Sequence, residues 1–340
     1  MPVCLFSRFA SASLVAALFF APAAALAEWY QHSFNVMGTR ASVELWQQRV
    51  DTAKKLAREV ELEMRRLEAA MSPYIESSEL SLINREAFSR PVDISPEMHA
   101  LLERSIEFGD LSAGAFDISF ASAGHLYNYR EGVKPSASAL ETVLPAVNYK
   151  SIKLELKKKG GTTVRFTKPG MKIDLGGIAK GYAVDQGIRL LEKHGVQAAM
   201  ISAGGDSRML GDRGVHPETG ERLSWVIGVR HPRDETLSAL RLPLSNAAIS
   251  TSGDYERFFD EAGHRYHHII VPDTGKSARG VVSVSIIGPK SIDCDALSTT
   301  VFVLGVEKGL ALIDTVPEYD AIIIDANGSV HYSAGLAAAR

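Results

Sequence analysis

The sequence predicts an α+β fold, in which mixed and largely antiparallel sheets are flanked by helices. Short segments rich in branched and aromatic residues recur along the chain and are typical of strands. Stretches with apolar residues at helical spacing stand between some of them. The two kinds of segment do not alternate strictly, as they would in a parallel β-α-β architecture, and this favours the α+β class.

The first half of the chain combines amphipathic helices with short strands. Residues 51–71 carry apolar side chains on one helix face, and Ser95-Pro96 opens a second helix. Residues 131–149 are polar and contain proline, so we expect a surface excursion there. Strands are predicted at residues 41–46, 151–156, 163–166 and 171–174, and the second and third of these form a hairpin around Gly160-Gly161.

The second half is richer in strands. A helix is expected to start near Ile178 and end at Gly195, and a buried helix over residues 295–304 is expected to end at Gly305. Strands are predicted at residues 197–202, 225–230, 247–251, 266–271 and 281–287, and a last hairpin joins residues 321–324 and 330–333 around Asn327-Gly328.

Residues 1–27 have the features of a cleaved signal peptide. Arg8 supplies a positive charge, residues 14–20 an apolar core, and Ala25-Leu26-Ala27 the small residues of a cleavage site. The apolar run is too short to cross a bilayer. No later segment looks long and apolar enough, so we expect no transmembrane segment in the mature chain. We expect a periplasmic protein of residues 28–340, folded as one large domain or as two lobes.

Charge and cysteine content narrow the possible functions. The chain has 37 Lys+Arg against 40 Asp+Glu, a formal net charge of −3, and no basic stripe, which argues against nucleic-acid binding. Cys4 leaves with the signal segment, so Cys294 remains alone and no intrachain disulfide is expected. No cysteine follows the cleavage site, so we expect no lipid anchor there.

The most informative segment spans residues 171–185 and reads Met-Lys-Ile-Asp-Leu-Gly-Gly-Ile-Ala-Lys-Gly-Tyr-Ala-Val-Asp. It brings Asp174, a Gly-Gly turn, Lys180 and a helix start close together. Glycines let the backbone approach a ligand, and a helix start favours phosphate oxygens. An acid near a phosphate implies a bridging divalent cation. The alternative is an ordinary strand–turn–helix corner with a surface lysine.

The second informative segment is Asp295-Ala-Leu-Ser-Thr299. Residues four apart share a helix face, so Asp295 and Thr299 can point at one ion. A carboxylate with a hydroxyl suits a hard cation such as Mg²⁺. The alternative is a helix capped by Asp293 or Asp295, with Thr299 merely packed. We expect Cys294 to be a core thiol, because a thiolate mismatches an oxygen-rich magnesium site.

Histidine, glycine and aromatic positions add further candidates. Strand alternation sends His267 and His268 to opposite faces, so at most one faces a given site as a general base. Gly204-Gly205, after a strand, either presents amides to a nucleotide or forms a plain turn. Tyr74 and Phe116 are suited to stacking on a ring system, although core packing is the more common role.

These segments, in this order, resemble the ApbE family of FAD:protein FMN transferases from about Phe34 to Gly305. Residues 174–185 and 295–299 are the specific signatures, and Met37-Gly38-Thr39 and residues 202–206 support them. The resemblance implies an exported bacterial enzyme that binds FAD and Mg²⁺. It implies transfer of FMN to a Ser or Thr of an exported or membrane-anchored flavoprotein, through a phosphodiester, with release of AMP.

The resemblance also implies roles for single residues. Asp295, Thr299 and the carbonyl of Gly177 correspond to Mg²⁺ ligands, and His268 corresponds to the general base, so that His268 and Asp295 are the catalytic candidates. The chain departs from the family pattern at Val271 and Asp273. The positions that correspond to FAD contacts are Met37, Tyr74, Ala115, Phe116, Asp117, Asp174, Lys180, His268 and Ile269.

Two other functions remain open at this point. A Mg²⁺-dependent FAD pyrophosphatase would use water in place of the protein hydroxyl and yield free FMN and AMP. A periplasmic flavin-binding protein without turnover would yield no AMP. Asp295, Thr299 and His268 argue against storage, because storage needs no base.

Overall fold

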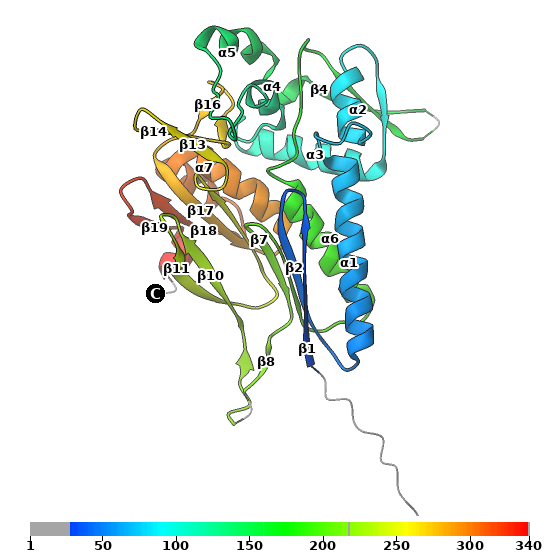
Figure 1. Ribbon diagram of the computed structural model, residues 1–340, viewed down its shortest axis with the longest axis vertical. Coiled ribbons are helices and arrows are strands. Elements are labelled where there is room, and N and C mark those ends of the chain that lie inside the picture. Colours follow the sequence, from blue (N-terminus) through cyan, green and yellow to red (C-terminus); the bar gives the residue numbers. More distant parts are fainter. Residues whose placement is uncertain (1–27, 159, 217, 339–340) are drawn as a thin grey trace, which may run out of the picture.

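The computed structural model describes residues 28–158, 160–216 and 218–338 (Figure 1). The predicted signal segment, residues 1–27, lies outside the described residues. Figure 1 shows one large sheet with long helices beside it and a group of shorter helices across its upper end. The predicted α+β fold with mainly antiparallel sheets is confirmed.

The main sheet has eight strands, and every neighbouring pair in it is antiparallel. Most of the strands were predicted from their branched residues, within a few positions at each end. In spatial order the strands are β1 (Glu28–Val36), β2 (Thr39–Gln47), β6 (Ala199–Ala203), β7 (Asp206–Leu210), β12 (Ala248–Gly253), β17 (Val281–Gly288), β18 (Asp320–Asp325) and β19 (Val330–Tyr332).

Three long helices cover one face of this sheet. They are α1 (Val50–Met71), α6 (Ala179–Lys193) and α7 (Ser291–Ile313). α1 lies against β1 and β2, α6 against β6 and β7, and α7 against β12 and β17. Alternate strand residues such as Leu45, Ile201 and Val284 are fully buried in this layer, because successive side chains of a strand point to opposite faces.

A hairpin covers part of the other face. It consists of β10 (Trp225–His231) and β11 (Asp234–Leu244), which pair antiparallel. Trp225 is buried there with Met209 and Ile249 in a second, smaller apolar cluster, and its ring meets Trp29 edge-to-face at 5.1 Å. Beside this hairpin, the outer face carries polar side chains, among them Ser42, Ser207 and Thr251.

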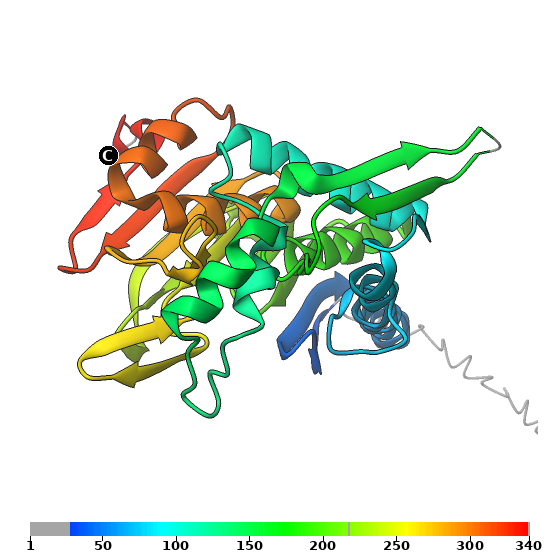
Figure 2. The same ribbon diagram turned by 90° about the horizontal axis from the view of Figure 1, so that it is seen from above.

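The chain between α1 and α6 forms a segment that lies across the end of the sheet (Figure 2). Residues 131–149, predicted as a surface excursion, contain a helix whose Leu140 is buried, as is Tyr149. The elements are α2 (Glu79–Glu86), β3 (Val92–Ile94), α3 (Pro96–Leu111), η1 (Ile118–Phe120), α4 (Ala121–Gly124), α5 (Ala137–Val143), η2 (Leu144–Ala146), η3 (Tyr149–Ser151), β4 (Ile152–Leu156) and β5 (Thr162–Phe166).

Short pairs of strands complete the fold. Tyr129 Oη donates to His267 O at 3.3 Å, and Lys134 pairs with Glu261, so the inserted segment contacts a hairpin beyond β12. The remaining elements are β8 (Gly214–Val215), β9 (Arg222–Leu223), β13 (Phe258–Glu261), β14 (His264–His267), β15 (Ile270–Val271), β16 (Lys276–Ser277) and α8 (Ala334–Ala338).

Residues 171–174 were predicted as a strand, and this prediction is wrong. The segment pairs with no strand of the described residues. The side-chain amide of Asn84 takes the place of a neighbouring strand: its Oδ1 accepts from Ile173 N at 2.8 Å and its Nδ2 donates to Ile173 O at 2.9 Å. Asp174 N donates to Ile118 O at 2.9 Å. The apolar residues are buried as expected, but the ladder is made by a side chain.

α7 corrects two expectations. It does not end at Gly305 but kinks there, at φ 80° and ψ −179°, and continues to Ile313. Within the described ranges it is also the one helix long and apolar enough to cross a membrane by length and composition, contrary to the expectation that no later segment qualifies. Its contacts explain the composition, because it packs on β12, β17 and α6 and buries Asp293 and Asp295.

A buried carboxylate joins α6 to α7. Lys290 is the N-cap residue of α7, but its side chain makes no capping hydrogen bond. Asp185 of α6 does so instead: it accepts from Ser291 N and from Ile292 N, each at 3.0 Å, and from Arg208 Nη1 at 2.7 Å. The N-terminal end of α7 is therefore held against the middle of α6 by hydrogen bonds to a charged group.

Asp185→Ala should lower the free energy of unfolding by about 3 kcal/mol, because it leaves the Arg208 charge and two helix N–H groups without their partner. Urea unfolding followed by circular dichroism measures this. Glu192→Ala, at an exposed position of the same helix, is the control and should change little. Equal stability of both variants would contradict the capping role.

Candidate active site

Two buried carboxylates share one ammonium group where α6 starts. Lys180 Nζ lies 2.7 Å from Asp206 Oδ2 and 3.2 Å from both carboxylate oxygens of Asp295. Gly181 N donates to Asp295 Oδ2 at 3.0 Å. Asp295 is 3% exposed. When both carboxyl groups are ionised, the cluster carries one more negative than positive charge, which favours the binding of a further cation.

The pKa values in this cluster follow from burial and from the neighbouring charges. Burial raises the pKa of Asp295, Asp206 raises it further, and Lys180 opposes both. Burial alone lowers the pKa of Lys180, but Asp206 and Asp295 outweigh it and leave that pKa above its usual value. Lys180 therefore stays charged at physiological pH.

Close helix packing brings the predicted metal ligands together. A β-carbon placed on Gly177 would lie 3.2 Å from Thr299 Oγ1, and Asp295 is one turn earlier on α7. Ser252 Oγ lies 3.4 Å from Thr299 Oγ1. The alternative that Asp293 or Asp295 caps α7 is wrong, because Asp185 caps it.

These donors fit a magnesium ion. The side chains and the carbonyl of Gly177 offer oxygen only, which is what Mg²⁺ prefers. No group of three or more His, Cys, Asp or Glu side chains suited to a metal occurs in the part of the chain that the structure describes. Mg²⁺ commonly takes its other ligands from substrate phosphates and water. Neighbouring Cys294 is fully buried, and burial raises the pKa of its thiol, as expected of a core residue.

His267 and His268 differ in surroundings. His267 is 3% exposed, its Nε2 lies 2.8 Å from Ala278 O, and its ring meets Phe302 edge-on. The predicted strand over residues 266–271 is interrupted after His267, between β14 and β15. His268 stands in this break, and its Nδ1 is buried with no hydrogen-bond partner within the described residues.

His268 is held neutral. Burial lowers its pKa to about 3, and the positive charge of Arg257 adds to this effect. A neutral imidazole with a ring nitrogen left without a partner can accept a proton from a ligand. His268 N donates to Arg257 O at 3.1 Å, which fixes the backbone of the break.

The positions that correspond to flavin contacts differ in burial: some are buried or half-buried, and one is exposed. Phe116 is buried, and its ring lies 3.4 Å from where a β-carbon on Gly177 would be; Ala115, beside it, is half-buried. Ile269 is buried next to His268. Tyr74, in contrast, is 84% exposed in the turn after α1, with its ring free to meet a ligand.

Met37 and the two acidic positions support the backbone around this site. Met37 has a φ of 53°, and its N donates to Glu68 Oε1 at 2.7 Å. Asp117 accepts from Ser119 N, Ser119 Oγ and Tyr149 N, at 2.6 to 2.9 Å. Asp174 accepts from Gly176 N at 2.6 Å, and burial raises its pKa. Asp117 therefore positions the loop that carries Ala115 and Phe116.

Sequence reasoning missed Arg257, Asp206 and Ser252. Arg257 Nη2 lies 3.4 Å from where a β-carbon on Gly38 would be, and its side chain makes no hydrogen bond or ion pair with any described residue. Its charge acts on both Asp174 and His268. Asp206 directly follows Gly204-Gly205, which the sequence indicates as a turn or a nucleotide contact. No spacing signal marks Arg257, which reaches the site through folding of the loop after β12.

The chain is similar over most of its length to known proteins. The ApbE family model matches residues 37–323. An FAD:protein FMN transferase of Treponema pallidum is 35% identical over 316 residues, covering 90% of this chain and 87% of the relative. One of Vibrio cholerae is 28% identical over 295 residues, covering 85% of each.

Solved structures of ApbE proteins have the same fold as this chain. The ApbE protein of Thermotoga maritima superimposes with a TM-score of 0.81 at 32% identity, covering 92% of this chain and 99% of that one. The flavin transferase ApbE of Vibrio cholerae has a TM-score of 0.79 at 27% identity, with the same coverage.

Gly181→Ala should separate α6 from α7, because the new β-carbon would lie 2.2 Å from Ser291 O. We expect a loss of about 1–3 kcal/mol in the free energy of unfolding, as is typical of overpacking. A crystal structure of the variant should show the Lys180–Asp295 distance lengthened. Lys193→Ala, at an exposed site on the last turn of α6, is the control. An unchanged distance and stability would contradict the close-packing argument.

Proposed function

Because the chain belongs to the ApbE family, we propose that it transfers FMN from FAD to a serine or threonine hydroxyl of an acceptor protein and releases AMP. The observation that carries this proposal is a single cluster. It brings Gly177 and Thr299 together beside the Lys180–Asp295 ion pair, and the charge of Lys180 also acts on His268, whose Nδ1 is buried without a partner in the described residues. FAD:protein FMN transferase is also the name of the curated relatives.

We infer that Asp295, Thr299 and the carbonyl of Gly177 hold Mg²⁺. When bound, the ion stabilises negative charge on the FAD pyrophosphate. The excess negative charge of the Lys180 cluster supports this assignment, as does the all-oxygen donor set.

Lys180 and Arg257 are the cations that would contact the phosphates. Lys180 is 26% exposed and sits in the first turn of α6, where helix N–H groups also favour phosphate oxygens. Arg257 has no ion-pair partner in the described segments, and its fork of N–H groups matches phosphate geometry. Transfer of a phosphoryl-type group depends mostly on such positioning and electrostatics.

His268 serves as the general base. Its Nδ1 takes the proton of the acceptor hydroxyl, whose oxygen then forms the ester bond to the FMN-side phosphorus. The bond from that phosphorus to the AMP oxygen breaks, and AMP leaves. Phe116 and Tyr74, from the chain between α1 and α6, and Met37, from the β1–β2 turn, would contact the flavin.

We further propose that the protein works in the periplasm after cleavage of residues 1–27. The acceptor is then an exported or membrane-anchored flavoprotein, because both substrates must meet in one compartment. Val271 and Asp273 lie in β15 and the turn that follows it, close in sequence to His268. They are candidates for adjusting acceptor contacts.

Incubation with FAD, Mg²⁺ and a purified apo-acceptor tests the function. The acceptor is an exported flavoprotein of the same organism, produced in cells that lack this enzyme. In-gel flavin fluorescence and intact mass should show one FMN per acceptor, with an equal amount of AMP. Free FMN with AMP and no labelled acceptor would favour the pyrophosphatase. The absence of AMP would favour a flavin-binding protein without turnover.

Asp295→Ala should abolish Mg²⁺-dependent AMP release, because it removes the one carboxylate of the donor set. AMP is measured by chromatography across a Mg²⁺ titration. Asp293→Ala is the matched control on the same helix, since Asp293 bonds to Arg104 and Tyr319 instead. Wild-type turnover by the Asp295 variant at low Mg²⁺ would rule out the metal assignment.

His268→Ala should slow transfer by about 10²–10⁴-fold, the usual contribution of a general base. His267→Ala should mainly reduce stability, because His267 is packed and bonded to Ala278. Initial rates per folded molecule, corrected by a thermal melt, separate the two effects. Equal rate losses in both variants would contradict the assignment of the base.

A further inference from the structure

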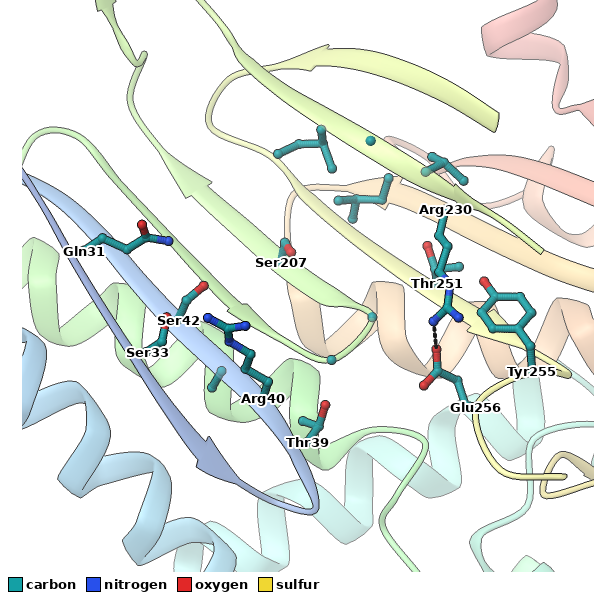
Figure 3. A pocket seen from close by; sticks show the side chains of 17 residues that line it. Gln31, Ser33, Thr39, Arg40, Ser42, Ser207, Arg230, Thr251, Tyr255 and Glu256 are labelled. Carbon is teal, nitrogen blue, oxygen red and sulfur yellow. Dashed lines mark ion pairs between the residues drawn. The ribbon is translucent and has the colours of Figure 1, made fainter. Parts of the chain in front are cut away.

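A cleft of about 480 Å³ lies on the sheet face opposite α6 and α7 (Figure 3). Its floor is the outer face of β1, β2, β7 and β12, and one wall is β10. Figure 3 shows polar side chains spread over this floor and Arg230 with Glu256 at the far side. The polar side chains of the floor are Gln31, Ser33, Thr39, Arg40, Ser42, Ser207 and Thr251.

The wall presents the edge of a strand. Four consecutive residues of β10, 227–230, line the cleft. Successive side chains of a strand point to opposite faces, so four in a row indicate that the strand turns its edge to the cleft. Among the described strands, β10 pairs with β11 alone. The other edge therefore offers main-chain N–H and C=O groups that can accept an extended polypeptide as an added strand.

One end of the cleft reaches the active site. The Gly204-Gly205 turn lines the cleft and leads directly into Asp206, which binds Lys180 on the other side of the sheet. A β-carbon on Gly205 would lie 2.4 Å from Thr251 O, so the turn is packed tightly onto β12. The turn that lines the end of the cleft is therefore continuous with the residue that contacts Lys180.

A second hollow adjoins the cleft. It measures about 400 Å³ and shares Thr39 and Arg40 with the cleft. It continues over Gly38, beside which Arg257 lies. The two hollows together run along both sides of the β1–β2 turn, from the outer sheet face to the edge of the site.

The cleft is separate from the positions attributed to FAD and Mg²⁺. None of those residues is part of its lining. A transferase needs room for two substrates, and the protein hydroxyl is not accounted for by the flavin positions. The edge of β10 suits a polypeptide, whose main chain can pair with it along its length, better than a nucleotide.

Arg40 adds charge to the floor. It is exposed, and its side chain makes no hydrogen bond or ion pair with another described residue. Figure 3 shows its guanidinium group over the floor near Ser42. Such a group donates to main-chain carbonyls or carboxylates of a bound chain.

We propose that an extended segment of the acceptor protein binds in this cleft as an added strand on β10. The segment passes the Gly204-Gly205 turn and delivers its Ser or Thr hydroxyl to His268. There the hydroxyl proton goes to His268, the oxygen binds the FMN phosphorus, and AMP leaves with the electron pair of the broken bond. This assignment rests on the proposed transfer function.

Arg40→Glu and, separately, Ser42→Trp test the cleft, the first by reversing its charge and the second by filling it. The probe is the apo-acceptor of the transfer assay, titrated at saturating FAD and Mg²⁺. Each variant should raise the KM for the acceptor about tenfold or more, as expected for a central interface residue. The affinity for FAD, followed by flavin fluorescence, should stay within about twofold of wild type. Arg241→Glu and Val226→Trp, exposed positions of the same hairpin outside the cleft, are the matched controls and should behave as wild type.

The outcomes separate the two proposals. Wild-type KM values for the acceptor in both cleft variants would overturn the cleft assignment while leaving the transfer function intact. A loss of FAD affinity in step with the acceptor effect would also overturn it, and would make the cleft part of the nucleotide site. AMP formation by the wild-type protein without labelled acceptor would instead remove the transfer function and the cleft assignment together. A thermal melt of each variant confirms that it is folded.

Discussion

The contact between the first turns of α6 and α7 is the constraint on which the site depends. Gly177 and Lys180 come from one side of it, and Asp295 and Thr299 from the other. Two features hold the helices this close: the absence of a side chain at Gly181 and the carboxylate of Asp185, which caps α7 from outside. The segment of residues 171–185 therefore sets the packing of the two helices, in addition to presenting the residues proposed to bind the ligands. Its last acidic residue, Asp185, has a structural role, whereas its first, Asp174, lies at the site.

Local geometry made part of this site predictable. Asp295 and Thr299 are four residues apart on a helix, so their shared face follows from helical periodicity alone. The different surroundings of His267 and His268 likewise agree with strand alternation, although the strand breaks between them. The fold class followed in the same way from recurring short strands. The family resemblance added the grouping of distant positions, which spacing cannot supply.

The features that sequence reasoning missed depend on tertiary contacts. Residues 171–174 have a strand-like pattern, yet Asn84, about ninety positions earlier, supplies their hydrogen bonds. Asp206 meets Lys180 only because the start of β7 and the first turn of α6 come together in the folded chain. The apolar composition of α7 marks burial between layers of this fold, and its kink at Gly305 requires only a positive φ that glycine tolerates. No local pattern in the sequence carries these facts.

The ammonium of Lys180 has a consequence for how the protein is assembled. Two buried carboxylates without a counter-ion would repel each other strongly enough to oppose folding. Lys180 neutralises half of that charge from within the chain, at 2.7 Å from Asp206 and 3.2 Å from Asp295. We infer that the polypeptide can fold without the proposed Mg²⁺, unlike small metalloproteins that are unfolded until they bind their metal. The proposed Mg²⁺ would then bind to and leave an already folded protein, and its occupancy would depend on the ion concentration and not on refolding.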